Sequence, residues 1–276
     1  MNPHPFDRAL ELEPSGLRAG HSTGRTSPDF WNMVGPFGGV TAAVALQSVL
    51  RHPDLLGAPV ALTVNYAAAI EAGDFEVQAT PVRTNRSTQH WTVQITQAEA
   101  SGQPRMTTTA TLVTAQRRET WGAIDAPMPA VGRPADTERI AIGPQGVAWI
   151  HQYEMRPVSG FVPSDWNGGG DHSESVVWLR DAQGRALDFA ALTALSDMFF
   201  PRVWLRRATR VPAGTVSMTT YFHADAAQLA EVGTGYLLGR ATGQAFRNGF
   251  FDQSAQLWSE SGALVATTNQ IVYYKE

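Results

Sequence analysis

The pattern of apolar and polar positions divides the chain into a helix followed by strands, and then repeats that order. Apolar residues recur at helical spacing within residues 30–50, and this pattern ends near His52-Pro53. Strand-like patterns then cover 59–70, 74–83, 89–98 and 105–115. Further along, the pattern predicts a strand over 147–155, a helix over about 187–200, and strands near 214–223, 232–242, 249–259 and 263–274.

The two halves also resemble each other in sequence. Three landmarks repeat in order, 37–46 at 189–198, Tyr66 at Tyr221 and the turn Ser101-Gly102 at Ser261-Gly262, with offsets of 152, 155 and 160 residues. We interpret the chain as an N-terminal half (1–115), a proline-rich linker (116–146) typical of a connector rather than a packed element, and a C-terminal half (147–276). Two such halves side by side can join into one continuous antiparallel sheet that wraps two helices, an α+β architecture.

The repeat is chemically asymmetric at three positions. Its register sets a polar residue of the second half against an apolar residue of the first, with Asp197 opposite Ala45, Thr215 opposite Val60, and Gln270 opposite Ala110. Duplication builds the scaffold, and this asymmetry indicates where the chemistry is kept.

Asp197 lies in a segment that is apolar nearly all round, which favours a buried helix. A carboxylate there needs hydrogen bonds, and its desolvation would raise its pKa, which suits a general base. The alternative is an aspartate in the last turn before Pro201 that points to solvent. The contrast with Ala45 favours the functional interpretation.

Thr215 and Ser217 lie two apart on a predicted strand, so we expect their hydroxyls to share one face. Hydroxyl side chains are common in strands, and either could be purely structural. Gln270 is flanked by apolar residues in a segment that should be buried, where its amide must find partners. The case for these residues rests on their joint asymmetry with Asp197.

Gly38 and Gly39 open the first helix. Backbone N–H groups at a helix N-terminus can bind a phosphate or a developing oxyanion. Glycine equally serves close packing of a helix on its neighbours, and the sequence leaves both interpretations open.

Several other motifs are weaker. The sequence 20–24 matches G-x-S-x-G, but no strand–turn–helix context surrounds Ser22, so we do not predict a serine hydrolase. The run 171–174 (DHSE) lacks metal-ligand spacing, and the glycines at 233–239 miss the dinucleotide-binding pattern. We interpret 160–175, with its glycine run, as a loop at the lip of a site.

Composition narrows the class of protein. The 276 residues carry 43% hydrophobic and 17% charged residues with a net charge of −4, which is typical of a globular protein and does not favour nucleic acid. There is no cysteine, which excludes disulfides and thiolate chemistry. The N-terminus does not resemble a signal peptide, and no apolar run approaches the ~20 residues of a membrane span, so we expect a cytoplasmic protein.

In this order and spacing, five segments resemble the acyl-CoA thioesterase II family of double-hotdog proteins. They are 37–39 (FGG), 156–157 (RP), 195–197 (LSD), 221–223 (YFH) and 262–270 (GALVATTNQ). Family members often have glutamine after the glycine pair, where this chain has Val40. That difference concerns the identity of the substrate more than the type of reaction.

The resemblance implies a pair of hotdog folds, each a helix wrapped by an antiparallel sheet, and hydrolysis of acyl-CoA without metal or organic cofactor. It implies that Asp197, Thr215 and Gln270 surround a water molecule, and we expect Gly38 or Gly39 to contact the oxyanion. We also expect a homo-oligomer, because hotdog halves commonly pair through sheet edges. The alternatives are a non-catalytic acyl-CoA or lipid-binding protein and an enoyl hydratase. The hydratase resembles families with a histidine five residues after the aspartate, where this chain has Arg202.

Overall fold

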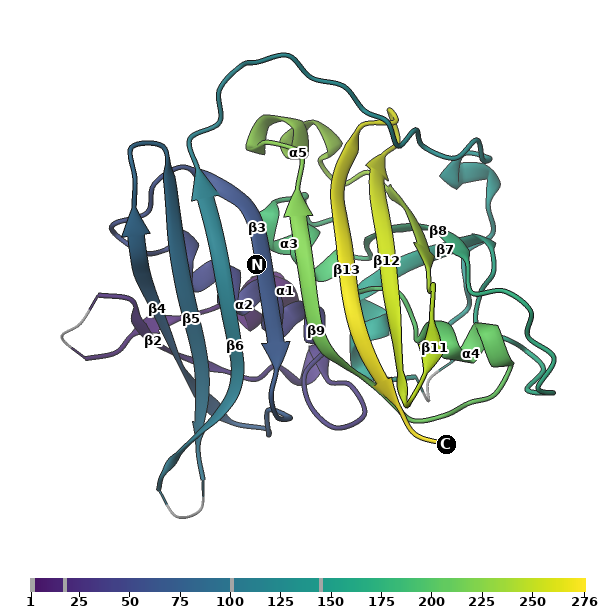
Figure 1. Cartoon of the computed structure of the whole chain (residues 1–276), viewed down its shortest axis with the longest axis horizontal. Coiled ribbons are helices and arrows are strands. Elements are labelled where there is room, and N and C mark those ends of the chain that lie inside the picture. Colours follow the sequence, from purple (N-terminus) through teal and green to yellow (C-terminus); the bar gives the residue numbers. More distant parts are fainter. Residues whose placement is uncertain (1–2, 17–18, 100–101, 144–145) are drawn as a thin grey trace.

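One antiparallel sheet runs through both halves of the molecule (Figure 1). The computed structural model describes residues 3–16, 19–99, 102–143 and 146–276. Within them the sheet has 13 strands in the order β1-β2-β4-β5-β6-β3-β9-β13-β12-β10-β8-β7, with β11 paired to β12. Met1 and Asn2 of the N-terminus and Ser101 of the predicted turn lie outside the described residues.

The strands of the N-terminal half are β1 (Glu13–Pro14), β2 (His21–Arg25), β3 (Ala58–Tyr66), β4 (Asp74–Thr84), β5 (Thr88–Ala98) and β6 (Pro104–Ala115). Those of the C-terminal half are β7 (Tyr153–Ser159), β8 (Ser175–Asp181), β9 (Ala213–Phe222), β10 (Leu237–Thr242), β11 (Phe246–Arg247), β12 (Phe250–Ser259) and β13 (Leu264–Tyr274). The helices are α1 (Pro5–Ala9), α2 (Gly38–Leu50), α3 (Phe189–Leu195), α4 (Arg202–Arg207) and α5 (Ala226–Val232), with 3-10 turns η1 (Pro28–Phe30), η2 (Pro134–Asp136) and η3 (Ala148–Gln152).

The two halves meet where β3 pairs with β9. Thr63 and Thr219 stand directly opposite each other, with their Oγ1 atoms 2.9 Å apart. Strand order is mirrored about this pair, because β6, β5 and β4 continue on one side and β13, β12 and β10 on the other. The predicted joining of two halves into one continuous sheet is therefore confirmed.

This arrangement corrects the register that we took from the sequence. Thr63 pairs with Thr111 in β6, and Thr219 pairs with Asn269 in β13. Asn269 therefore corresponds to Thr111 in the repeat. One residue further along each strand, Gln270 corresponds to Leu112 rather than to Ala110.

The match for Thr215 changes in the same way. A bulge skips Val60 in β3 and Val216 in β9, so Thr215 matches Pro59. The register taken from the sequence was wrong because it equated Tyr66 with Tyr221. Tyr221 is 45% exposed, whereas the Tyr66 hydroxyl donates inward to the Gly38 carbonyl. Successive side chains of a strand face opposite sides, so these two tyrosines cannot be equivalent. Leu112 and Pro59 are both apolar, and the asymmetry itself survives.

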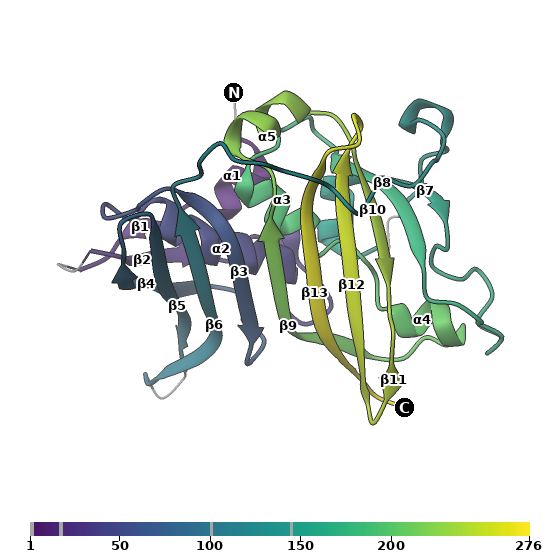
Figure 2. The same cartoon turned by 45° about the horizontal axis from the view of Figure 1, so that its top comes forward.

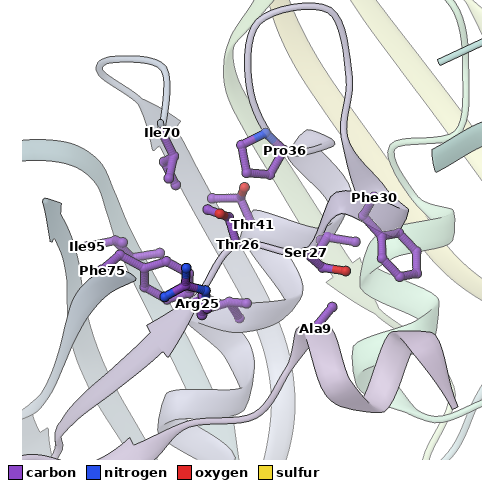
Figure 3. A pocket seen from close by; sticks show the side chains of 12 residues that line it. Ala9, Arg25, Thr26, Ser27, Phe30, Pro36, Thr41, Ile70, Phe75 and Ile95 are labelled. Atoms are coloured by element: carbon purple, nitrogen blue, oxygen red, sulfur yellow. The ribbon is translucent and has the colours of Figure 1, made fainter. Parts of the chain in front are cut away.

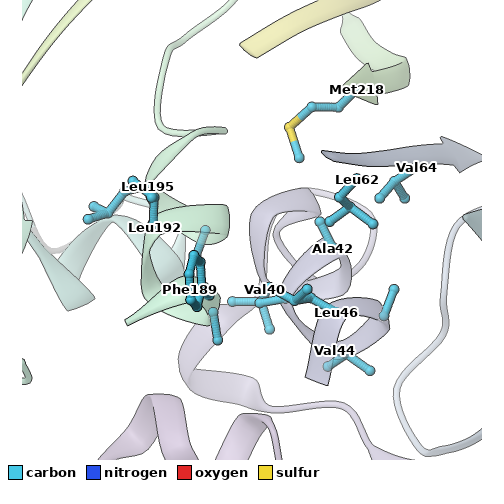
Figure 4. Close-up of a cluster of buried hydrophobic side chains, with 14 of the residues drawn as sticks. Val40, Ala42, Val44, Leu46, Leu62, Val64, Phe189, Leu192, Leu195 and Met218 are labelled. Carbon is cyan, nitrogen blue, oxygen red and sulfur yellow. The ribbon is translucent and has the colours of Figure 1, made fainter. Parts of the chain in front are cut away.

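The core lies between the helices and the central strands. Figure 4 shows side chains of α2 and α3 packed together beneath Leu62 and Val64 of β3 and Met218 of β9. Small residues allow this close approach, because a Cβ on Gly39 would lie 2.6 Å from the Ala194 carbonyl oxygen. Burial on nearly every side explains why α2 shows apolar residues all round.

The linker is irregular in structure but packs on the sheet face that is turned away from α2 and α3 (Figure 2). Met128 and Val131 contact an apolar cluster formed by Val176, Trp178, Tyr236 and Leu238. The indole N–H of Trp258 donates to the Ala126 carbonyl at 2.9 Å. The expectation of a connector that does not pack is wrong in this respect, because indole donors and apolar side chains hold it against the strands.

Most predicted elements of the repeat are present, with a few differences. The predicted helix over about 187–200 is shorter, since α3 ends at Leu195. The strand predicted over 147–155 is instead η3 followed by β7, and the start of 232–242 belongs to the end of α5 and a turn. In the described part of the chain, no helix is long and apolar enough to cross a membrane.

Candidate active site

Three of the residues singled out from the sequence form one chain of hydrogen bonds. Gln270 Nε2 donates to Oδ1 of Asp197 at 2.9 Å, and Thr215 Oγ1 donates to Oε1 of Gln270 at 3.1 Å. The two bonds use the donor and the acceptor end of the glutamine amide, which fixes its orientation. The amide therefore links a carboxylate to a hydroxyl across the floor of the site.

A β-bulge decides which hydroxyl faces this site. Ser217 pairs with Ile271 and Thr215 pairs with Val272, so two residues of β9 span one residue of β13. Directly opposed residues share a face, and Ile271 is 45% exposed whereas Val272 is buried. Ser217 therefore faces outward and Thr215 inward. The expectation that both hydroxyls share one face is wrong, because the bulge at Val216 reverses the alternation.

Asp197 follows α3 in a turn, where its backbone N–H donates to the Ala194 carbonyl. Its carboxylate does not point to bulk solvent but lines an internal cavity, where it keeps partial exposure. Burial raises its pKa from 3.8 to about 7, while hydrogen bonds from Gln270 and the Gly39 backbone act in the opposite direction. An aspartate with this pKa is a good proton acceptor near neutral pH.

The glycine pair at the start of α2 serves two purposes. A Cβ on Gly38 would lie 2.8 Å from Oδ2 of Asp197, so glycine leaves room for the carboxylate. Gly39 allows the close contact with the Ala194 carbonyl described above, and its N–H is directed to Asp197. The close-packing interpretation therefore applies to both glycines, and the binding of a phosphate or an oxyanion stays a prediction.

Asp197, Gln270 and Thr215 open onto a cavity of about 620 Å³ between the two halves. A volume of this size is typical of small-molecule sites. Most of its lining is apolar or aromatic and includes Phe37, Trp149, Phe161, Phe199, Phe200 and Trp204. The rings of Phe37 and Trp149 stack with centroids 4.2 Å apart, which joins the start of α2 to η3.

The apolar lining continues into the N-terminal half. Figure 3 shows a small neighbouring pocket between the end of β2 and the first turns of α2. Its volume is about 20 Å³. Pro36, Thr41 and Ile70 line both this pocket and the large cavity. An extended apolar ligand in the large cavity would therefore meet further apolar surface in this direction.

Sequence reasoning missed several residues of the cavity. The Tyr66 hydroxyl donates to the Gly38 carbonyl at 2.9 Å, and burial together with the charge of Asp197 raises its pKa well above 10. Trp149 and Gln253 also line the cavity. Matching β12 with β5 through the corrected register could have found Gln253, because its counterpart is Trp91, another apolar residue.

The motifs at 20–24, 171–174 and 233–239 do not line this cavity, whereas Phe161 and Val162 of the 160–175 loop do. Ser22 lies within the short strand β2, so the sequence 20–24 is not a nucleophile elbow. In the 160–175 loop, the Ser173 hydroxyl donates to the Gly243 carbonyl at 2.9 Å, and Glu174 pairs with Arg240. Gly233 forms the C-cap of α5.

Comparison with protein families identifies the chain. Residues 27–113 match the acyl-CoA thioesterase N-terminal domain, and residues 123–274 match the acyl-CoA thioesterase C-terminal domain. The chain belongs to the acyl-CoA thioesterase family. This membership supports thioester hydrolysis in general terms, without identifying the residues that carry it.

Solved structures agree with the fold. A hotdog-fold protein of unknown function from Alicyclobacillus acidocaldarius is 42% identical over 100% of this chain and 99% of its own, with a TM-score of 0.92. A candidate thioesterase II from Thermobifida fusca is 21% identical over 98% of this chain and 97% of its own, with a TM-score of 0.80. The TesB protein of Mycobacterium avium subsp. paratuberculosis is 15% identical over 99% of this chain and 100% of its own, with a TM-score of 0.78. A search of curated proteins finds no match.

Proposed function

We propose that the protein hydrolyses the thioester of acyl-CoA to free acid and CoA, with a water molecule activated by Asp197. The observation that carries the proposal is the hydrogen-bond chain from Asp197 through Gln270 to Thr215, which opens onto a largely apolar cavity. A carboxylate with a pKa of about 7 supports the role of general base.

In the proposed reaction, Asp197 takes a proton from water while the water oxygen attacks the thioester carbonyl carbon. The tetrahedral intermediate then collapses, the C–S bond breaks, and the proton on Asp197 passes to the leaving CoA sulfur. Gln270 holds the carboxylate in place, and the Thr215 hydroxyl fixes the orientation of the amide. No acyl-enzyme forms on this route.

The negative charge that develops on the carbonyl oxygen needs donors at the site. We assign this role to the Gly38 N–H at the start of α2, because the Gly39 N–H is directed to Asp197. The positive end of the α2 dipole also faces this point and favours an anion there. Gly39 then contributes indirectly, by holding the base that Gly38 faces.

The acyl chain fits the apolar side of the cavity, with its tail directed toward Pro36 and Ile70. Met33 and Val34 line the cavity and are 57% and 79% exposed, which places apolar side chains where a lipid chain would enter. Arg210, exposed on the same lining, offers a cation to the phosphates of CoA.

The test is release of free CoA from a panel of acyl-CoAs, short to long and including aromatic ones, with the wild type beside Asp197→Ala. Turnover that Asp197→Ala loses by roughly a hundredfold or more, with folding intact, supports the assignment. A trapped covalent acyl-enzyme would contradict the general-base route. Binding of acyl-CoA without any turnover would instead favour the non-catalytic acyl-CoA-binding alternative.

A homo-oligomer and a cytoplasmic location also belong to this proposal. The described sheet ends in two edge strands, the two-residue β1 and β7, whose Met155 carbonyl already accepts from the Ile140 N–H, so we propose pairing through the rest of these edges. Light scattering on the purified protein would measure the assembly, and a monomeric mass would contradict it.

A further inference from the structure

A fourth position of the repeat shows the same polar-for-apolar contrast. Gln253 in β12 stands directly opposite Gln270 in β13, and Trp91 in β5 stands directly opposite Leu112 in β6. Because Gln270 matches Leu112, Gln253 matches Trp91. Two neighbouring glutamines thus replace two neighbouring apolar residues on the inner face of the sheet, beside the proposed base.

The amide of Gln253 is buried without a partner. The residue is 2% exposed and belongs to the wall of the large cavity. Its Nε2 and Oε1 are both covered and have no hydrogen-bond partner among the residues that the structure describes, so a ligand reaches this amide when the side chain turns toward the cavity. Burial of such an amide opposes folding unless something satisfies it. A purely structural role would be better filled by an apolar residue, as Trp91 fills it in the other half.

Other buried glutamines of this fold behave differently. Gln89 accepts from the Leu56 N–H at 2.8 Å and donates to the Asp54 carbonyl at 3.0 Å. Gln97 accepts from the Glu71 N–H at 2.8 Å and donates to its carbonyl at 2.9 Å. Both of these amides stabilise turns of the first half. Gln253 therefore differs from these two buried glutamines, whose amides both have hydrogen-bond partners.

The place and chemistry of Gln253 define what it can bind. An amide offers one donor group and one acceptor without net charge, which suits a hydroxyl or keto oxygen, whereas an ionised group buried there would need a countercharge. Residues directly opposite on neighbouring strands are about 5 Å apart. The partner group therefore lies within the first few carbons of the thioester carbonyl, if that carbonyl is held beside Gln270.

We propose that Gln253 recognises an uncharged oxygen substituent, hydroxyl or keto, near the thioester end of the acyl chain. The inference rests on the proposed thioesterase function and narrows its substrate class. The preferred substrates are then oxygenated acyl-CoAs, and plain alkanoyl-CoAs of the same length are poorer substrates because they leave the amide unpaired.

The experiment compares 3-hydroxyoctanoyl-CoA with octanoyl-CoA, with 5-hydroxyoctanoyl-CoA to test position. The wild type, Gln253→Leu and Thr268→Val are assayed for kcat/KM on each. Thr268 is the matched control, because its buried hydroxyl also has no partner among the described residues but does not line the cavity. We expect Gln253→Leu to lower the hydroxyacyl-to-alkanoyl ratio about tenfold or more, with an unchanged or higher Tm, and Thr268→Val to leave the ratio unchanged.

Two results would overturn the inference. They are an unchanged ratio in Gln253→Leu, including an equal loss on all the substrates, and an equal shift of the ratio in Thr268→Val. Calorimetric binding of non-hydrolysable thioether analogues, with and without the hydroxyl, separates this inference from the proposed reaction. If the wild type binds both analogues but releases no CoA, the reaction fails, and the effect of Gln253→Leu on the two affinities still decides the role of Gln253.

Discussion

Gln270 donates a hydrogen bond to Asp197 at 2.9 Å, and this bond joins β13, the last strand along the chain, to the turn after α3. It ties the proposed base to a strand that is paired on both sides, because β13 lies between β9 and β12. The bond also favours the ionised carboxylate and so opposes the effect of burial on its pKa. Reactivity at this site therefore depends on the balance of these two effects.

The activity is expected to depend on pH through Asp197. A general base works in its ionised form, and burial raises the pKa of this carboxyl to about 7. We predict that kcat/KM rises with pH, on the order of tenfold per unit well below pH 7, and levels off above about pH 8. A pH profile of kcat/KM should show this rise, measured with a control that the enzyme stays folded at each pH. A flat profile between pH 5 and about 9 would contradict it.

Removing the Gln270 amide should move that profile. Because the hydrogen bond from Gln270 lowers the pKa of Asp197, its loss raises that pKa further. We predict that Gln270→Leu lowers activity and shifts the rise of kcat/KM to higher pH. The matched variant Leu112→Met, at the equivalent position of the first half, should leave the midpoint of the profile unchanged. A midpoint that does not move in Gln270→Leu would mean that the two side chains are not coupled.

The Thr215 hydroxyl should matter through its hydrogen bond to Oε1 of Gln270. Thr215→Ser keeps the hydroxyl and should retain most activity, whereas Thr215→Val keeps the shape and should lose about tenfold or more. Ser217→Ala is the control, since Ser217 faces the other side of the sheet. Equal activities of Thr215→Val and the wild type would show that the reaction does not depend on this hydroxyl.

The two glycines of α2 should respond differently to alanine. In Gly38→Ala the new Cβ would lie 2.8 Å from Oδ2 of Asp197, so we predict a tenfold or greater loss of activity with little change in stability. In Gly39→Ala the new Cβ would lie 2.6 Å from the Ala194 carbonyl, so we predict a loss of about 1–3 kcal/mol in the free energy of unfolding.

Gly122→Ala is the control for both variants, because a Cβ there meets nothing within 4 Å. Urea unfolding and CoA release on the same preparations separate the two effects. A Gly38→Ala enzyme as active as the wild type would contradict the close approach of this glycine to the base.

The same carboxylate should cost stability at high pH. Its pKa in the folded protein, about 7, is above its ordinary value of 3.8, so the folded state binds the proton more tightly than the unfolded state does. The contribution of Asp197 to the free energy of unfolding of the wild type therefore falls as pH rises from about 4 to about 7. We predict that Asp197→Asn is more stable than the wild type at pH 8 by about 1–4 kcal/mol, and that this gain vanishes below about pH 4. Denaturant unfolding at both pH values measures it, and a gain that is equal at both would assign the effect to packing.

Much of the fold could be predicted from the sequence, because periodicity and repetition report on burial. The segment 89–98 alternates cleanly and is β5 within one residue. Strand β8 was missed because its core, 176–179 (VVWL), is buried on both faces and does not alternate. Its continuous apolar run was the available signal.

The site could be predicted less completely. Asp197 differs in polarity from each of residues 43–46, whereas Gln270 contrasts with Ala110 and Leu112 but not with Thr111 between them. The choice between Thr215 and Ser217 depends on a bulge at Val216, which nothing in the local sequence marks. Gln253 required the true strand pairing, because its counterpart Trp91 lies 162 residues earlier, an offset that no sequence landmark indicated.

The central claim is that Asp197 activates water in thioester hydrolysis. The most direct test is the rate of CoA release by Asp197→Asn and by the wild type at pH 8, on the best acyl-CoA found. Asparagine keeps the size of the side chain and an oxygen that can accept from Gln270, but it cannot take a proton. The account predicts a loss of about 10²–10⁴-fold in kcat with the acyl-CoA still bound and the fold intact. A variant that releases CoA within a fewfold of the wild-type rate would contradict it.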